Sequence, residues 1–237
     1  VSGGPVLADT GEKLADLSKD VEFDVEDTAD NVAAEVTGSN GAGDLDEANA
    51  VVVSGGDVTA SEADAIQSIS GYVGTASDYD ITDTAAALIS ATDSVLNVDG
   101  VDIVTASDTS VNANIGGDLA GFTADIEFNV LDDADAIAIE VAASGTGAGS
   151  LDEANNVAVV SGDVTASEAD AIQAISGYVG TASDYDVTDT AAALISATDS
   201  VLNVDGVDTV TVSDGPVNAD DGTTVSYTHL RAHETRY

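Results

Sequence analysis

The chain has 237 residues, of which 45 are Asp or Glu and only 4 are Lys or Arg, giving a formal net charge of −41. So acidic a surface repels phosphate backbones and anionic lipid headgroups, which excludes nucleic-acid partners. No apolar run approaches the roughly 20 residues of a membrane-spanning helix, so we expect no membrane insertion. The absence of Cys removes disulfides and sulfur-ligated metal sites.

An internal repeat dominates the sequence. Residues 57–108 recur at 163–214 with four substitutions, a period of 106, and the opening VSGGPV is echoed by VSDGPV at 212–217. We therefore expect one repeat unit over residues 1–105, a second over 106–211 and the start of a third over 212–224. A chain that opens at a recurring point is expected to be a piece of a longer protein.

Aromatic residues mark the beginning of one type of strand. Each is followed by Asp or Asn and then by Val or Ile, at Phe23, Tyr79, Phe128 and Tyr185. Alternation in YDVTD predicts that Tyr185 and Val187 face the core. A second strand type, VDTVTVSDG from residue 207, places Val210 and Val212 inward.

Helices are predicted between these strands. Thr59 with Glu62, and their repeats at 165 and 168, have the spacing of a capping box. Over residues 83–100 we expect a helix that Asp83 caps, with an apolar stripe that includes Leu88 and Leu96, and that Gly100 ends. ADAIAIEVAAS at 134–144 alternates like a strand, but its place in the repeat favours a helix.

The resulting order is strand, helix, strand, helix over about 53 residues, repeated four times. Such alternation predicts an α/β fold with parallel strands and crossover helices, and its repetition predicts a β-α-β-α solenoid of about four half-units. The alternative is a series of immunoglobulin-like β-sandwiches, because about 106 residues is also the size of one such domain. The Ala-rich capped segments count against that alternative.

The acidic composition suggests a saline or calcium-containing medium, because molar salt shortens the screening length to roughly 3 Å and carboxylates bind hard cations. NVDGVD resembles the start of an EF-hand loop, although the Glu that would close the loop is missing. Calcium is the cofactor that this pattern suggests, and turn formation is the alternative role. The candidate ligands are Asn97, Asp99, Asp102, Asn203, Asp205 and Asp208.

We expect no enzymatic activity. Both histidines, His229 and His233, lie in the last 13 residues, and there is no Cys nucleophile, P-loop or dinucleotide fingerprint. Residues 225–237 differ abruptly in composition from the rest, and VSYTHLRAHET resembles a translated sequencing-library adapter. We therefore interpret this tail as an artefact and leave it out of the fold prediction.

The segment YDVTDTAAALISATDSVLNVDGVDTVTVSDGPVNADDG resembles the tandem DTAAxL…VxVSDG repeats of very large secreted or cell-surface proteins of marine cyanobacteria and alphaproteobacteria. The resemblance implies export by a type I secretion apparatus and an extracellular structural or adhesive role. The partners expected on this basis are flanking repeats of the same protein and surface glycans or other cells.

Two other functions stay open at this point. One is a carbohydrate- or ice-binding module, which needs a row of exposed side chains such as Thr82 and Thr188, although their counterparts Glu26 and Leu131 interrupt it. The other is an acidic cytoplasmic protein of a halophile, whose composition would be similar.

Overall fold

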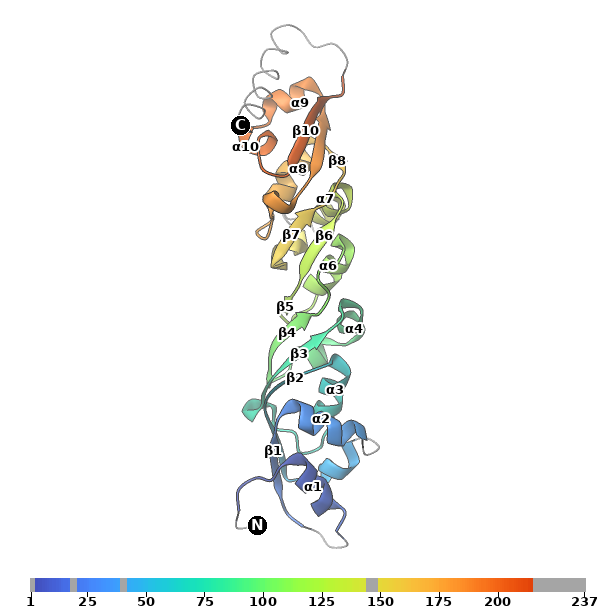
Figure 1. Ribbon diagram of the computed structural model, residues 1–237, viewed down its shortest axis with the longest axis vertical. Coiled ribbons are helices and arrows are strands. Elements are labelled where there is room, and N and C mark those ends of the chain that lie inside the picture. Colours follow the sequence, from blue (N-terminus) through green and yellow to red (C-terminus); the bar gives the residue numbers. More distant parts are fainter. Residues whose placement is uncertain (1–2, 18–20, 39–41, 144–148, 215–237) are drawn as a thin grey trace. The chain divides into compact units, whose positions relative to one another are not determined.

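The computed structural model describes residues 3–17, 21–38, 42–143 and 149–214 (Figure 1). The chain forms two compact units. Unit 1 comprises Val1–Asp108 with Phe122–Glu127, and unit 2 comprises Thr109–Gly121 with Phe128–Tyr237. Residues 215–224 of the third repeat expected over 212–224, and the adapter-like tail at 225–237, lie outside the described residues.

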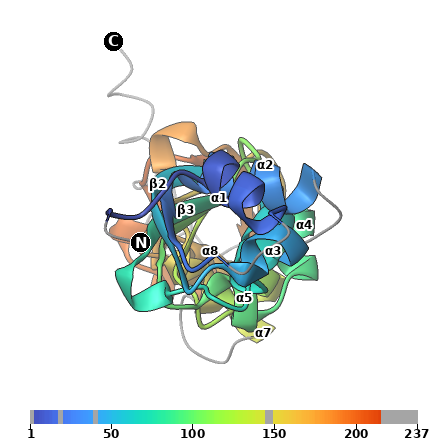
Figure 2. The same ribbon diagram turned by 90° about the horizontal axis from the view of Figure 1, so that it is seen from below.

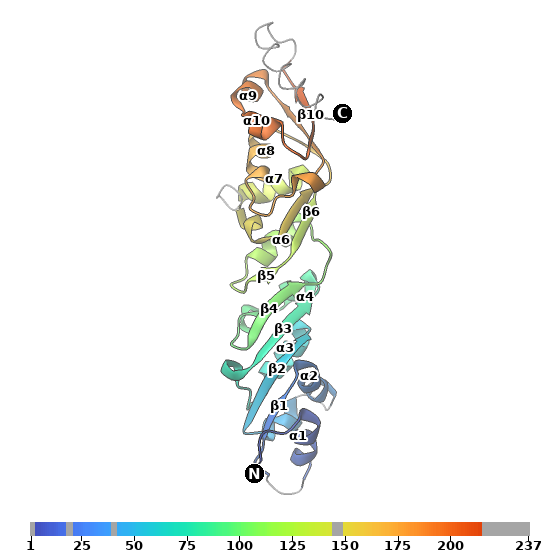
Figure 3. The ribbon, with the colours of Figure 1, turned by 60° about the vertical axis from the view of Figure 1, so that its left-hand side comes forward.

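Unit 1 alternates helices and strands. Its elements are α1 (Ala8–Ala15), β1 (Asp24–Asp27), α2 (Ala29–Gly38), η1 (Ala42–Glu47), β2 (Ala50–Val58), α3 (Ala60–Gln67), η2 (Gly74–Ala76), β3 (Asp78–Asp83), α4 (Ala85–Ser90), α5 (Asp93–Leu96), β4 (Val101–Ala106) and β5 (Ile126–Glu127). The five strands form one sheet in the order β1-β2-β3-β4-β5, so each strand lies beside the next in the sequence (Figure 3).

Unit 2 repeats this plan. Its elements are α6 (Ala113–Ala120), β6 (Asn129–Asp132), α7 (Ala134–Ala143), η3 (Gly149–Glu153), β7 (Asn156–Val159), β8 (Asp163–Val164), α8 (Ala166–Gln173), η4 (Gly180–Ala182), β9 (Tyr185–Asp189), α9 (Ala191–Ser196), α10 (Asp199–Leu202) and β10 (Val207–Val212). β6 pairs with β7, and β8, β9 and β10 form a second sheet. β7 and β8 correspond to the two halves of β2.

Every named strand pairing in the described residues is parallel. Parallel neighbours require a crossover connection, which the intervening helices supply. The predicted α/β class with parallel sheets is therefore confirmed, and the immunoglobulin-like alternative, which needs antiparallel sheets, is wrong. Residues 134–143 are helical as expected, although their apolar residues alternate.

The core lies between one face of each sheet and the helices. In unit 1, α1, α2 and α3 lie on the same side of β2 and β3 (Figure 2). The strands bury alternate residues, such as Val25, Val51 and Ile81, each at most 1% exposed. The aromatic residues that begin the first strand type are also buried, at 1–3% exposure: Phe23, Tyr79, Phe128 and Tyr185.

The capping boxes at Thr59 and Thr165 form as predicted. The expected single helix over residues 83–100 is wrong. α4 ends at Ser90, because Ala91 is extended (ψ 171°), and α5 begins after Thr92. Thr84 caps α4 through its side chain, so Asp83 is left for another role.

The residues of the second strand type that were predicted to face the core are buried in one copy and half-buried in the other. In β4, Val104 and Ala106 are 3% and 7% exposed, whereas their counterparts Val210 and Val212 in β10 are only half-buried. The two strands differ at only two positions, Ile103 against Thr209 and Ala106 against Val212. β5 covers β4 in unit 1.

Gly100 offers a test of the turn that leads into β4. Its φ is +104°, and a Cβ there would overlap the Tyr72 hydroxyl and lie 3.0 Å from the Gly74 carbonyl oxygen. We expect Gly100→Ala to lower the free energy of unfolding by about 1–3 kcal/mol, measured by urea denaturation. Gly38→Ala is the control, because a Cβ there meets nothing within 4 Å. Equal stability of the two variants would contradict this role for Gly100.

Candidate functional site

The recurring polar feature of both units is an Asp at the end of a strand or two residues beyond it. Asp83 ends β3, and its Oδ1 accepts a hydrogen bond from the N–H of Thr84 at 2.8 Å. Its Oδ2 accepts from the N–H of Ala60, the first residue of α3, at 3.2 Å. α3 belongs to the preceding strand–helix (βα) motif, so one carboxylate joins two successive motifs.

The same contact occurs six times in the described residues. In each case a carboxylate oxygen lies 2.7–3.2 Å from the N–H of an Ala that begins the helix of the preceding βα motif, 19 or 23 residues earlier. The pairs are Asp27 with Ala8, Asp83 with Ala60, Asp108 with Ala85, Asp132 with Ala113, Asp189 with Ala166 and Asp214 with Ala191. We call these six residues the linking aspartates.

The contact satisfies a donor that the helix itself leaves unpaired. The first N–H groups of a helix have no partner within the helix, and its N-terminus favours negative charge. The Ala residues are buried, so no solvent replaces the carboxylate; Ala8 and Ala113 are fully buried. A small side chain at this position lets the helix start approach the strand end.

The sequence-based prediction did not include this arrangement. The capping prediction looked for partners within a few residues, whereas the linking aspartates reach back 19 or 23 residues. The sequence does contain a pattern that marks these residues. In ITDTA and VTDTA, an Asp at the end of a strand comes directly before the Thr-Ala pair that begins a helix, and this motif recurs with the repeat.

At the start of α7, a backbone carbonyl group takes the place of the carboxylate. The Ala134 N–H donates to the Ser161 carbonyl at 2.8 Å, and Gly162, at φ +119°, lies against Ala134. In unit 1, Gly56, at φ +111°, lies against Ala29 in the corresponding place. A side chain on either glycine would meet the helix start, so these turns bring strand and helix together without an Asp.

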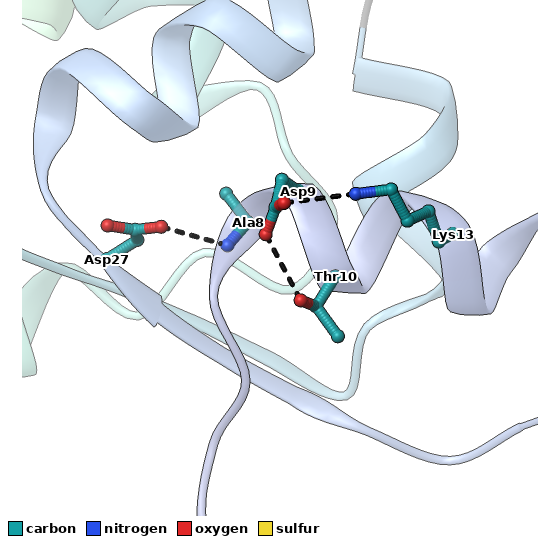
Figure 4. Close-up of polar contacts among 5 residues, drawn as sticks. All are labelled: Ala8, Asp9, Thr10, Lys13 and Asp27. Carbon is teal, nitrogen blue, oxygen red and sulfur yellow. Dashed lines mark hydrogen bonds and ion pairs between the residues drawn. The ribbon is translucent and has the colours of Figure 1, made fainter.

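Asp27 is the most buried of the linking aspartates, at 9% exposure. Burial raises the pKa of its carboxyl group, but hydrogen bonds from the Asn31 side chain and from the N–H groups of Ala8 and Thr28 outweigh burial, so the pKa lies below its usual value. Figure 4 shows the Asp27 carboxylate facing the Ala8 N–H.

A second group of contacts links βα motifs inside the core. The Gln67 side-chain amide donates to the Tyr79 hydroxyl at 2.8 Å and to the Val95 carbonyl at 2.9 Å. Burial raises the pKa of Tyr79 well above its ordinary value. Gln173, Tyr185 and Val201 repeat the arrangement in unit 2 at the same distances.

Four of the predicted calcium ligands lie on the turns that follow α5 and α10, whereas Asp102 and Asp208 are the second residues of β4 and β10. All six are exposed: Asn97, Asp99, Asp102, Asn203, Asp205 and Asp208. The carbonyls of Asp99 and Asp205 accept the hydroxyls of Tyr72 and Tyr178, at 3.0 and 3.1 Å, so these tyrosines anchor the turn. In the described residues no group of three or more His, Cys, Asp or Glu could hold a metal ion. Calcium at this turn stays a prediction.

Threonines on the outer sheet face are paired across strands; Thr82, Thr105 and Thr188 are half-buried and Thr211 is exposed. Thr82 lies opposite Thr105, which lies opposite Glu127, and in unit 2 Thr188 lies opposite Thr211. Glu127 therefore ends the threonine row on the β5 side. Glu26 and Leu131, the counterparts of Thr82 and Thr188, are both exposed, as the sequence suggested.

A shallow groove recurs on the helical side of both units. In unit 1 it has a volume of about 410 Å³, and in unit 2 about 350 Å³, with the same nine lining positions. The polar lining groups in unit 1 include Ser61, Asp64, Ser90 and Asp83, and Asp83 already accepts two backbone N–H groups. The remaining lining groups are hydroxyls, methyl groups and the exposed Asp64 carboxylate.

Unit 1 also carries the one ion pair in the described part of the chain, between Lys13 and Asp9 at 3.0 Å on the surface of α1 (Figure 4). Burial and the neighbouring Glu12 carboxylate raise the pKa of Glu35. In unit 2 the counterpart of Glu12 is Gly117, so the carboxylate pair is specific to unit 1.

Comparison with protein-family models, with curated proteins and with solved structures finds no match. Among the described helices, none has both the length and the apolar character needed to cross a bilayer. The fold defines the class of this protein as an α/β protein with parallel sheets, built on a repeated sequence.

The role of the linking aspartates is testable at Asp27. We expect Asp27→Asn to lower the free energy of unfolding by about 1–3 kcal/mol at pH 7, because the amide offers a single acceptor and no charge. Asp24→Asn is the matched control, since Asp24 lies on the exposed face of the same strand. Urea denaturation followed by circular dichroism measures both.

The pH dependence follows from the lowered pKa. The contribution of Asp27 is fully present above the pKa of an unfolded Asp, about 3.9, and is lost as the pH falls through the lower folded-state value. The stability difference between wild type and Asp27→Asn should therefore shrink below about pH 4. A difference that stays constant down to pH 2 would disprove the ionised contact.

Proposed function

We propose that this chain is a non-enzymatic structural or adhesive segment of a large acidic extracellular protein, in which successive βα motifs stack into one continuous solenoid. The proposal rests on the hydrogen bonds of the linking aspartates. Each holds the start of a helix in one βα motif and the end of a strand in the next. Such contacts make neighbouring motifs depend on one another and provide length rather than a reaction centre.

The content of each βα motif supports stacking. The helices bury mainly small residues, such as Ala29, Ala33 and Val36 in α2, and one βα motif contains few large apolar side chains. Each motif therefore covers its apolar face only by packing against its neighbours, as α1, α2 and α3 do in unit 1. Duplication of the 106-residue repeat lengthens such a stack without new chemistry.

The acidic surface supports an extracellular or cell-surface location in a saline medium. With a net charge of −41, the chain repels itself in dilute buffer, and salt relieves this cost. The resemblance to repeats of very large secreted proteins points the same way. In such a setting, flanking repeats of the same protein are the expected neighbours, and glycans or other cells are the expected adhesive targets.

The carbohydrate- or ice-binding alternative has less support. A flat recognition face needs regular side chains on many successive strands, and the threonine pair at Thr82 and Thr105 is followed by Glu127. No described feature separates the extracellular proposal from a halophile's cytoplasmic protein; the flanking gene sequence would, through a secretion signal or its absence.

Duplication supplies matched variants for testing continuous stacking. Leu88 in α4 and its counterpart Leu194 in α9 are 0% and 3% exposed. We expect Leu88→Ala and Leu194→Ala each to lower the midpoint of a single thermal transition of the whole chain, at a cost of about 2–5 kcal/mol. Differential scanning calorimetry measures the transition, and Leu17→Ala, at a 53% exposed site, is the control. Two transitions, of which each variant moves only one, would show independent domains instead.

Salt should stabilise the chain. We expect the free energy of unfolding to rise between about 0.1 M and 1 M NaCl, as the screening length falls from about 10 to 3 Å. Urea denaturation at each salt concentration measures the effect, and KCl should give the same curve. A larger gain with CaCl₂ at equal ionic strength would indicate a bound cation, and a flat NaCl curve would contradict the role of self-repulsion.

A further inference from the structure

The two units contain nearly identical segments. We call residues 57–108 segment 1 and residues 163–214 segment 2; they differ by four substitutions. Each segment binds the stretch directly before it, which contains the first part of β2 in unit 1 and β7 in unit 2. We call these stretches platform 1, residues 43–56, and platform 2, residues 149–162.

The main-chain hydrogen bonds between segment and platform are the same in both units. In unit 1 the Val51 N–H donates to the Gly71 carbonyl at 2.8 Å, and the Val51 carbonyl accepts the Val73 N–H at 2.9 Å. Unit 2 repeats both bonds at the same lengths: Val157 with Gly177 and Val157 with Val179. The main-chain pairing therefore does not distinguish one segment from the other.

Side-chain contacts at this boundary are duplicated as well. The Asp46 carboxylate accepts the Ser70 N–H at 2.6 Å, and the Ser77 hydroxyl accepts the Val53 N–H at 3.0 Å. The equivalents in unit 2, at 2.7 and 3.0 Å, are Asp152 with Ser176 and Ser183 with Val159. Segment 2 therefore carries the groups through which segment 1 contacts platform 1.

A glycine lets each segment approach its platform closely. A Cβ on Gly71 would lie 2.7 Å from the Ala48 carbonyl oxygen, and one on Gly177 would lie 2.5 Å from that of Ala154. The four differences between the segments fall elsewhere, at Ser68, Ile81, Ile103 and Ala106 of segment 1. Each platform thus fits either segment.

We propose that two copies of this chain associate by segment exchange. Segment 2 of one copy binds platform 1 of the other copy, whose own segment 1 binds the platform 2 that was vacated. This reciprocal exchange leaves no platform empty and keeps the boundary contacts, so its main cost is the association itself. It goes beyond the proposed function, because it depends on the duplicated contacts and not on continuous stacking.

Exchange competes with binding of each segment to its own platform. A segment that is joined directly to its platform has an effective concentration of the order of mM, so the native arrangement dominates at micromolar protein. Exchange is therefore expected when chains unfold and refold together, and more so when one native contact is weakened. Gly71→Ala weakens the binding of segment 1, through the overlap with the Ala48 carbonyl, and leaves segment 2 unchanged.

A disulfide reports the exchange, because the chain contains no Cys. Ser54 of platform 1 lies opposite Asp78 of segment 1, and Asp184 is the counterpart of Asp78 in segment 2; all three are exposed. Neighbouring strands lie about 4.8 Å apart, a separation that a disulfide bridges. A chain with Ser54→Cys and Gly71→Ala, refolded from urea with an Asp184→Cys chain under oxidising conditions, should give a disulfide-linked heterodimer. Non-reducing electrophoresis measures the yield.

The controls separate exchange from random collision. We expect Gly71→Ala to raise the yield about tenfold over the same pair without it, a factor that corresponds to a modest loss of binding free energy. Replacing Asp184→Cys by Asp118→Cys, at an exposed site on α6, gives the yield of random collision. Adding Gly177→Ala to the Asp184→Cys chain should return the yield to that value, because segment 2 then no longer fits platform 1.

Two results would overturn the proposal. One is a Ser54–Asp184 yield no higher than that of the Asp118→Cys control. The other is an equal yield when folded chains are mixed without urea, since exchange requires release of the segments. Circular dichroism of each chain before mixing checks that it is folded. The calorimetric test of Leu88 and Leu194 concerns coupling within one chain, so it can fail while exchange is found, and the reverse.

Discussion

The fold depends on a short contact between a strand-end carboxylate and a helix start in the preceding βα motif. Parallel strands cannot be joined by tight hairpins, so helices whose first N–H groups lack partners connect most of the strands. At Asp83 one side chain satisfies the start of α3 and also binds the N–H of Thr84, at the entrance to α4. Where it occurs, the contact holds the start of a helix against the end of the next strand.

The contacts of the linking aspartates change how the acidic composition is interpreted. Part of the negative charge lies at helix N-termini, where it is stabilising, while exposed residues such as Asp99 and Asp102 add to the repulsion between chains. The two effects respond differently to salt, because close contacts at partly buried sites are screened less than charges spread over the surface. High salt therefore relieves repulsion and leaves the linking contacts largely intact.

Local patterns predicted much of the local structure, whereas the distant contacts and one helix break were not predicted. The capping box at Thr59 and the buried strand starts at Tyr79 and Tyr185 follow from residues a few positions apart, and both are confirmed. Asp83 was assigned to the wrong helix because its partner, Ala60, lies 23 residues away and becomes a neighbour only when the sheet forms. The break at Ala91 was missed because Ala favours helix and the apolar stripe continues across it.

The duplicated sequence separates what a residue prefers from what its surroundings impose. Leu96 and Leu202 occupy the same place in the same motif, yet one is buried and the other half-buried, so sequence pattern alone does not assign their burial. In unit 1, β5 pairs with β4, and the N–H of Thr123 donates to Asp93 at the start of the helix that carries Leu96. In a repetitive α/β chain the hydrophobic core is thus completed by the next motif along, and the apolar residues of each motif already specify the neighbour that it needs.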